Sequence, residues 1–151
     1  MATLLEQSKR LAKLNEKVIV EQMFQALKKA ENKVIEANKN QLLKGENQLG
    51  DIVGVYSPYT EIYADRDGIL TDKTPGSPYN FNWSGDFYDG FNLSISGDEA
   101  TISSVGVGSG DKKEFLTTSN LFGLNDENLK EIIQSEIIPF INQFARNTIG
   151  I

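Results

Sequence analysis

Two carboxylates are the first candidates for chemistry in this sequence. Asp86 and Asp89 flank an aromatic pair, Phe87-Tyr88. Two carboxyl groups are what general acid–base hydrolysis of a glycosidic bond requires. An Asp placed after a Ser-Gly pair, as Asp86 is, also accepts hydrogen bonds from backbone N–H groups at a turn or a helix start. We favour this structural role over catalysis.

Two other segments resemble ligand-binding loops but depart from the required patterns. Residues 106–112 read Gly-Val-Gly-Ser-Gly-Asp-Lys, without Gly-Lys-Ser/Thr, and Asp111 stands where a dinucleotide motif has its third Gly. We predict a hairpin loop that opens no helix. Residues 65–68 read Asp-Arg-Asp-Gly, half of a calcium loop, but alignment on the Gly puts Thr74 where the bidentate Glu belongs. We predict a polar turn there.

The composition narrows the possible functions further. The 151 residues include no His and no Cys. Disulfides, Cys-ligated zinc, iron–sulfur clusters, His- or Cys-held haem, thiol catalysis and imidazole acid–base chemistry are therefore excluded. We predict that the protein is not an enzyme, with no catalytic residue, no cofactor and no metal site. No apolar run approaches the ~18–20 residues of a membrane span, and no export signal is visible, so we expect a soluble protein made in the cytoplasm.

Charge is divided unevenly along the chain. Residues 1–45 hold nine Lys/Arg and five Glu, whereas residues 46–151 hold six Lys/Arg and 16 Asp/Glu. A basic segment on an acidic body suggests docking against an acidic neighbour, such as another copy of the chain. A solvated, Lys-rich helix is the simpler alternative. Sequence-specific nucleic-acid binding is not expected, because the chain is acidic and its basic segment lacks interleaved aromatics.

Two helical regions frame a single predicted domain, residues 1–151. Apolar residues at three- and four-residue spacing, uninterrupted by Gly or Pro, predict one long helix over 3–38 within an N-terminal region 1–45. Asn38, Asn40 and Gly45 are expected to end it. This helix is long enough to project onto a neighbour.

The second predicted helix spans residues 125–148. Asn125 is a good N-cap, and acidic residues follow it in the first turn. Pro139 lies inside the apolar stripe and lacks a backbone N–H. We therefore expect the helix to kink or split near Glu136.

Residues 91–118 are predicted to form antiparallel strands. Phe91, Leu93 and Ile95 alternate with polar residues, and a Gly-Asp turn follows. The alternation slips at 103–104, which suggests a bulge, and a third strand is expected from Phe115. The predicted fold is α+β: a long N-terminal helix, a small antiparallel β-sheet (meander) and a C-terminal helix packed on it.

Residues 46–90 form an aromatic-rich region that includes a predicted loop over 60–82. Segment 56–91 holds nine of the 14 aromatic residues, including the one Trp. Long loops in compact domains are usually functional, and Tyr and Trp are typical interface anchors. The alternative is that these side chains cap the domain's own core. The candidate interface residues are Tyr59, Tyr63, Tyr79, Phe81 and Trp83.

Four short strings carry a resemblance to a known class of proteins. They are Ser-Gly-Asp-Phe-Tyr-Asp-Gly-Phe at 84–91, Asn-Gln-Leu at 40–42, Gly-Val-Tyr-Ser at 54–57 with Thr60, and Leu-Phe-Gly-Leu at 121–124. Over residues 40–130 the chain resembles small structural proteins of phages and prophages of Bacteroides-type bacteria. More loosely, it resembles the head–tail joining and tail-completion proteins of tailed phages.

The resemblance implies a virion protein made in the host bacterial cytoplasm. It implies a ring of copies in the neck between portal and tail, in contact with the portal or with adjacent neck and tail proteins. DNA would pass through the ring without sequence-specific binding, and no membrane is involved. The alternative is a soluble adaptor or inhibitor that binds a partner through residues 56–91.

Overall fold

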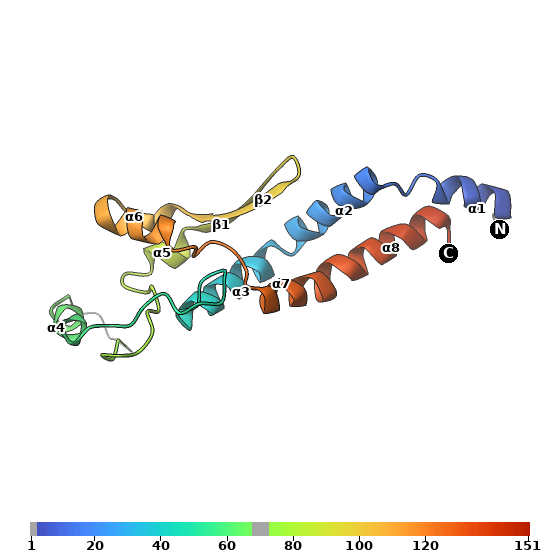
Figure 1. Ribbon diagram of the computed structural model, residues 1–151. Helices are drawn as coiled ribbons and strands as arrows, with labels where there is room; N and C mark the ends of the chain where they lie inside the picture. The colour runs from blue at the N-terminus through green and yellow to red at the C-terminus, as the bar shows by residue number, and fades with distance from the viewer. Residues whose placement is uncertain (1–2, 68–72) are drawn as a thin grey trace.

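The computed structural model describes residues 3–67 and 73–151 (Figure 1). Helices dominate this part of the chain, and a two-stranded antiparallel sheet accompanies them, so the predicted α+β class is confirmed. The elements in chain order are α1 (Leu4–Leu11), α2 (Glu16–Lys29), α3 (Glu31–Leu43), α4 (Pro58–Arg66), α5 (Asp86–Asp89), β1 (Phe91–Ser96), β2 (Glu99–Ser104), the 3₁₀ turn η1 (Val105–Val107), α6 (Gly110–Thr118), α7 (Asp126–Ile132), the π-helical turn η2 (Ile133–Ile137) and α8 (Ile138–Ile149).

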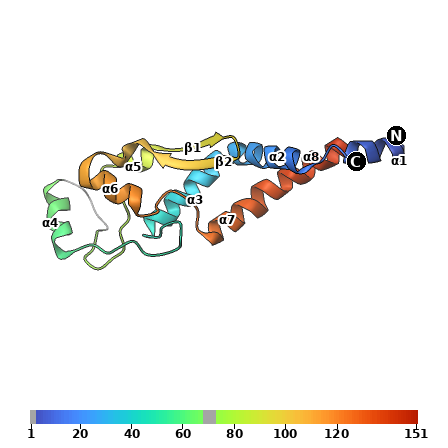
Figure 2. The same ribbon diagram turned by 45° about the horizontal axis from the view of Figure 1, so that its top comes forward.

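The molecule is elongated. Helices α1 to α3 run antiparallel to α7, η2 and α8, so that both marked chain ends lie at one end of the molecule (Figures 1 and 2). The β1–β2 hairpin lies along α2 and α3, and α4 lies at the opposite end. One buried cluster joins α2, α3, the hairpin, α6 and the C-terminal helices. The packing therefore produces a compact body and a narrow helical arm.

The single N-terminal helix predicted from the sequence is wrong, because the structure divides it into three. Chain between α1 and α2 leaves the helical path, and Asn15 then caps α2 by accepting a hydrogen bond from the Val18 N–H at 3.0 Å. At Ala30 the backbone departs from helical angles (φ −90°, ψ 10°), which bends α2 against α3. Local capping by one side chain is enough to restart a helix within an otherwise continuous apolar pattern.

The end of α3 was predicted in part. Gly45 has φ +84°, and its N–H donates to the Leu42 carbonyl at 2.9 Å, which is a glycine-type helix end. A Cβ on Gly45 would also lie 2.5 Å from Pro78 Cβ. Asn38 and Asn40 do not stop the helix; both lie inside α3.

The hairpin was predicted correctly, but the third strand was not. Its register runs without a bulge from Phe91 opposite Ser104 to Ser96 opposite Glu99, so the irregularity near 103–104 marks the end of β2. Phe91 and Leu93 are buried, as their alternation predicted. Phe115, the expected start of a third strand, lies in α6. The run at 106–112 accordingly leads into a helix, and the predicted hairpin loop is wrong.

The C-terminal helix follows the prediction closely. Asn125 caps α7 by accepting from the Asn128 N–H at 3.0 Å. The helix changes to a π-helical turn at η2, which contains Glu136, and Pro139 lies in the first turn of α8. A wide turn before the proline accommodates its ring and its missing N–H.

The aromatic-rich region holds more regular structure than predicted. Residues 58–66, expected as loop, form α4, and the predicted polar turn at 65–68 begins within that helix. Gly68 and the rest of 68–72 lie outside the described residues. A bridge between Val55 and Pro78 joins the two sides of the region.

Two buried amides of α3 hold the segment that leads into α7. Asn38 donates to the carbonyls of Leu121 and Gly123 at 3.0 and 2.9 Å and accepts from the Gly123 N–H at 3.3 Å. Gln41 donates to Gly123 O at 3.2 Å and accepts from the Asn125 N–H at 2.9 Å. We call Asn38 and Gln41 the amide latch. It satisfies a loop backbone that would otherwise be buried without partners.

Replacing Asn38 with Ala should destabilise the fold. The substitution leaves buried loop carbonyls without donors, and we expect a loss of about 2–4 kcal/mol in the free energy of unfolding, measured by urea denaturation. Asn40→Ala, on the exposed side of the same helix, is the matched control and should change stability by less than ~0.5 kcal/mol. Equal effects of the two substitutions would contradict the latch.

An ion pair links the N-terminal helices α1 to α3 with the C-terminal helices α7 to α8. Lys33 of α3 contacts Glu136 of η2 at 2.5 Å, and this hydrogen bond lowers the pKa of the Glu136 carboxyl group. A lowered pKa stabilises the folded state above the carboxyl's unfolded-state pKa, and this contribution is lost as the pH falls. Lys33→Met should raise the Glu136 pKa in an NMR titration, whereas Lys28→Met should leave it unchanged.

Candidate interaction surfaces

Six aromatic side chains converge on one pocket at the body of the molecule. The pocket has a volume of about 370 Å³ and is lined by two lysines and a set of aromatic residues that we call the aromatic pocket: Tyr56, Tyr79, Phe81, Trp83, Phe87 and Phe115. Several rings contact edge to face, including Tyr56 with Tyr79 at 4.9 Å between centroids. Trp83 and Phe115 remain 38% and 41% exposed, so the pocket presents aromatic surface to solvent.

Asn80 is the hub that positions the pocket wall. Its side-chain oxygen accepts from the Tyr56 hydroxyl at 2.7 Å, and its backbone carbonyl accepts from the Tyr88 hydroxyl at 2.5 Å. The side-chain oxygen Oδ1 of Asn80 also accepts from the Asn82 N–H at 3.1 Å, which closes a tight turn around Phe81. Phe81 has φ +54°, a left-handed conformation that is uncommon for a bulky residue. The hub holds this strained residue in place.

The two lysines of the pocket differ in their surroundings. Lys73 is buried, donates to Asn80 Oδ1 at 2.8 Å and to the Asn82 carbonyl, and its ammonium lies 5.7 Å from the Trp83 ring centroid. It is part of the wall. Lys112, on α6, is exposed, and its stem lies beside Gly108. The pocket is therefore lined mainly by apolar groups, and the long, exposed side chain of Lys112 places one positive charge at its edge.

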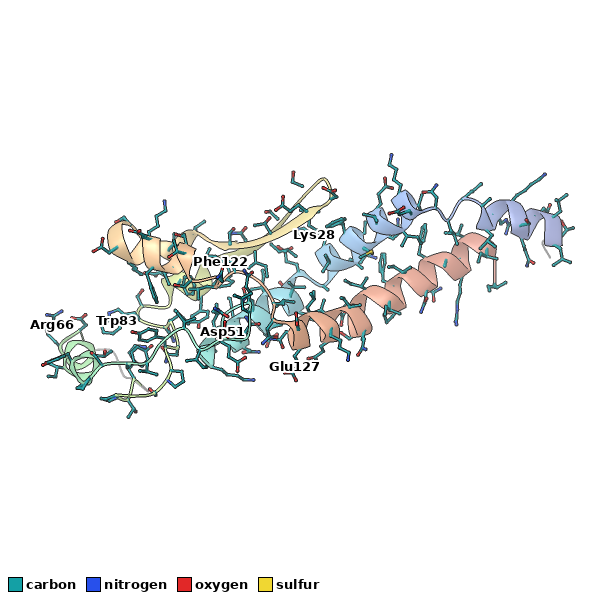
Figure 3. The ribbon with its side chains drawn as sticks, in the orientation of Figure 1. Lys28, Asp51, Arg66, Trp83, Phe122 and Glu127 are labelled. Carbon is teal, nitrogen blue, oxygen red and sulfur yellow. The ribbon has the colours of Figure 1, made fainter. Side chains whose placement is uncertain are left out.

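The predicted interface residues are brought together only in part. Tyr79, Phe81 and Trp83 line the aromatic pocket. Tyr59 lies on α4, is 69% exposed and does not line it. The side chain of Tyr63 lies outside the described residues. Figure 3 shows Trp83 toward the end of the molecule that carries α4.

Three pocket residues were missed by the sequence reasoning. Tyr56 and Phe87 lie inside the predicted aromatic segment, and their types alone could have marked them. Phe115 was assigned to a strand. Its helical neighbours, Asp-Lys-Lys-Glu at 111–114, are the signal that could have corrected this assignment.

Helix α1 presents its apolar side outward. Leu4, Leu5 and Leu11 are 85%, 65% and 55% exposed. The half-buried residues of α1 are instead the polar Gln7 and Arg10, and Arg10 donates to the Ile149 carbonyl of α8 at 3.5 Å. Amphipathic helices normally pack with the opposite orientation. This inverted helix leaves an apolar face at the tip of the arm without cover from the described residues.

The two candidate carboxylates, Asp86 and Asp89, lie at the two ends of helix α5. Asp86 begins α5, as expected, although it accepts from the Ser84 hydroxyl at 2.8 Å rather than from a backbone N–H. Asp89 is the last residue of the same four-residue helix. In residues 3–67 and 73–151, no group of three or more potential ligand side chains is placed to hold a metal ion.

None of the described helices is both long and apolar enough to cross a lipid bilayer. Comparison of the chain with protein-family models, curated proteins and solved structures gives no match. The structure itself offers two candidate interaction surfaces, the aromatic pocket and the inverted helix.

Replacing Asn80 with Ala should loosen the pocket wall. We expect a loss of about 2–3 kcal/mol in the free energy of unfolding, because buried hydroxyl and ammonium groups lose their acceptor. The Trp83 fluorescence emission should also shift to longer wavelength, because water gains access to the indole ring when the pocket wall loosens. Asn82→Ala keeps the backbone contacts of that residue and is the control. An unchanged Trp83 spectrum in the Asn80 variant would show that Asn80 does not organise the pocket.

Proposed function

We propose that this protein is a structural subunit of a phage particle, which assembles as a ring in the neck between the portal and the tail. Its partners are other copies of itself and the portal or adjacent neck and tail proteins. DNA passes through the ring without sequence-specific contacts. The resemblance in residues 40–130 supports the location in a phage neck. The shape and the exposed surfaces of the chain support assembly through contacts with other molecules.

The observation that carries this proposal is the inverted helix α1. Its leucines are exposed, whereas Gln7 and Arg10 are half-buried and Arg10 contacts α8. Exposing a Leu rather than burying it forgoes about 1.5–3 kcal/mol of hydrophobic stabilisation. Contiguous apolar patches of this kind mark interaction sites. A helix oriented this way supports a role as a contact element toward another molecule.

The elongated shape supports assembly by unlike surfaces. The apolar tip and the aromatic pocket lie toward opposite ends of the molecule (Figures 1 and 3). Contacts between two different patches on identical subunits generate rings when the rotation closes. A single chain with two such patches is suited to a ring.

Incorporation into particles tests this function. Quantitative mass spectrometry of purified virions should find the chain at a fixed multiple-copy ratio to the portal protein. Leu5→Glu should remain folded by circular dichroism yet be depleted from particles, because it places a charge on the contact face. Leu49→Glu, at a position that is also 65% exposed, should be incorporated normally. Absence of the wild-type chain from virions would refute the proposal.

A soluble adaptor or inhibitor is the second candidate, favoured by the aromatic pocket. Tyr and Trp side chains around a pocket resemble the anchors of a partner-binding site. This function predicts a one-to-one complex and loss of binding when Tyr79, Phe81 and Trp83 are all replaced by Ala. Normal ring assembly by that triple variant would argue against the adaptor function.

A further inference from the structure

We propose that helix α1 of one copy docks its leucine face into the aromatic pocket of the next copy. The inference rests on the proposed function only in that it requires copies of the chain to assemble. It specifies which two surfaces meet. The interface is head to tail, so each copy offers the tip of its arm to one neighbour and its pocket to the other.

Helix α1 can reach an aromatic pocket only on another copy of the chain. Within one chain, α1 packs on α8 at the end of the arm, whereas the pocket is formed by α5, α6 and residues near 56 and 79–83 in the body. The two lie apart along the long axis in both ribbon views (Figures 1 and 2). The leucines of α1 therefore cannot reach their own pocket while the arm keeps this packing.

The two surfaces match in kind. Leu4 and Leu11 are seven residues apart and share a helix face, with Leu5 beside them. This is the anchor spacing of helices that bind in apolar grooves. The pocket volume of about 370 Å³ falls within the ~300–1,000 Å³ typical of binding sites. Apolar anchors thus meet a pocket in which the rings of Trp83 and Phe115 are exposed in the single chain.

Charge favours the same pairing. Residues 3–14 hold three Lys/Arg and one Glu, whereas the two helices that flank the pocket, α5 and α6, together hold four Asp/Glu and two Lys, and the buried Lys73 adds one cation to the wall. Exposed Asp86 and Asp111 directly adjoin pocket residues on α5 and α6. Two α1 tips would repel each other, whereas a basic tip is attracted to this acidic end. A second copy in head-to-tail orientation is therefore preferred over a symmetric tip-to-tip dimer.

The lone tryptophan gives a direct readout of docking. Raising the concentration of the full-length chain should shift Trp83 emission to shorter wavelength, because docked leucines exclude water from the ring. Leu5→Glu should raise the apparent Kd for this shift by about thirtyfold or more. Leu49→Glu should behave as wild type. A shift of equal midpoint in both variants, or no shift in the wild type, would overturn the inference.

The absence of cysteine allows a second, geometric test. A chain with Leu5→Cys mixed with a chain with Ser84→Cys, at the pocket rim, should form the mixed disulfide in preference to the Leu5→Cys homodimer. Asp98→Cys, at the exposed hairpin tip, is the control partner and should cross-link weakly. Preferential Leu5→Cys homodimers, or no excess over the Asp98 control, would overturn head-to-tail docking.

The two proposals fail separately. If the chain is found in virions but the mixed disulfide is not formed, the neck function stands and this contact is wrong. If the mixed disulfide forms but the chain is absent from virions, the contact stands as self-assembly and the neck function is wrong.

Discussion

The amide latch is the interaction on which the arrangement of the molecule depends. Asn38 and Gln41 are almost fully buried on α3 and bind the backbone of the 121–125 segment. This segment must cross from the body to the start of α7, and its peptide groups cannot be buried without partners. By satisfying them, the latch fixes where the C-terminal helix begins. The antiparallel alignment of helices α7 and α8 with helices α1 to α3 follows from that starting point.

The residues that stabilise the fold are largely different from those that form the two candidate interaction surfaces. The buried cluster combines small residues of α2 and α3 with aromatic residues of α5 and β1, so the body is stabilised without the arm tip. Helix α1 adds no buried residue to this core. The aromatic pocket lies at the edge of the core: Phe87 belongs to the buried cluster, and the hydrogen bonds of Asn80 position the wall next to it. Both surfaces can therefore engage partners without unfolding the body.

Sequence patterns predicted the elements whose signals are local. The hairpin followed from alternation and a two-residue turn, and the C-terminal helix followed from the Asn125 cap and Pro139. Errors arose where neighbouring signals competed. Asn15 restarts a helix inside an unbroken apolar pattern, and Phe115 looked like a strand residue because of the strands before it. At Asn15, hydrogen bonding by a single side chain overrode the longer pattern.

The sequence by itself determined the fold class, the separation of basic and acidic segments, and the absence of His and Cys chemistry. These properties depend on composition and on short-range periodicity. Only the tertiary structure decided that the leucines of α1 face outward and that aromatic residues from positions 56 to 115 form one pocket. Both features depend on which helix face meets a neighbour and on contacts between distant segments. No local pattern encodes such contacts, because they are set by the packing of the whole chain.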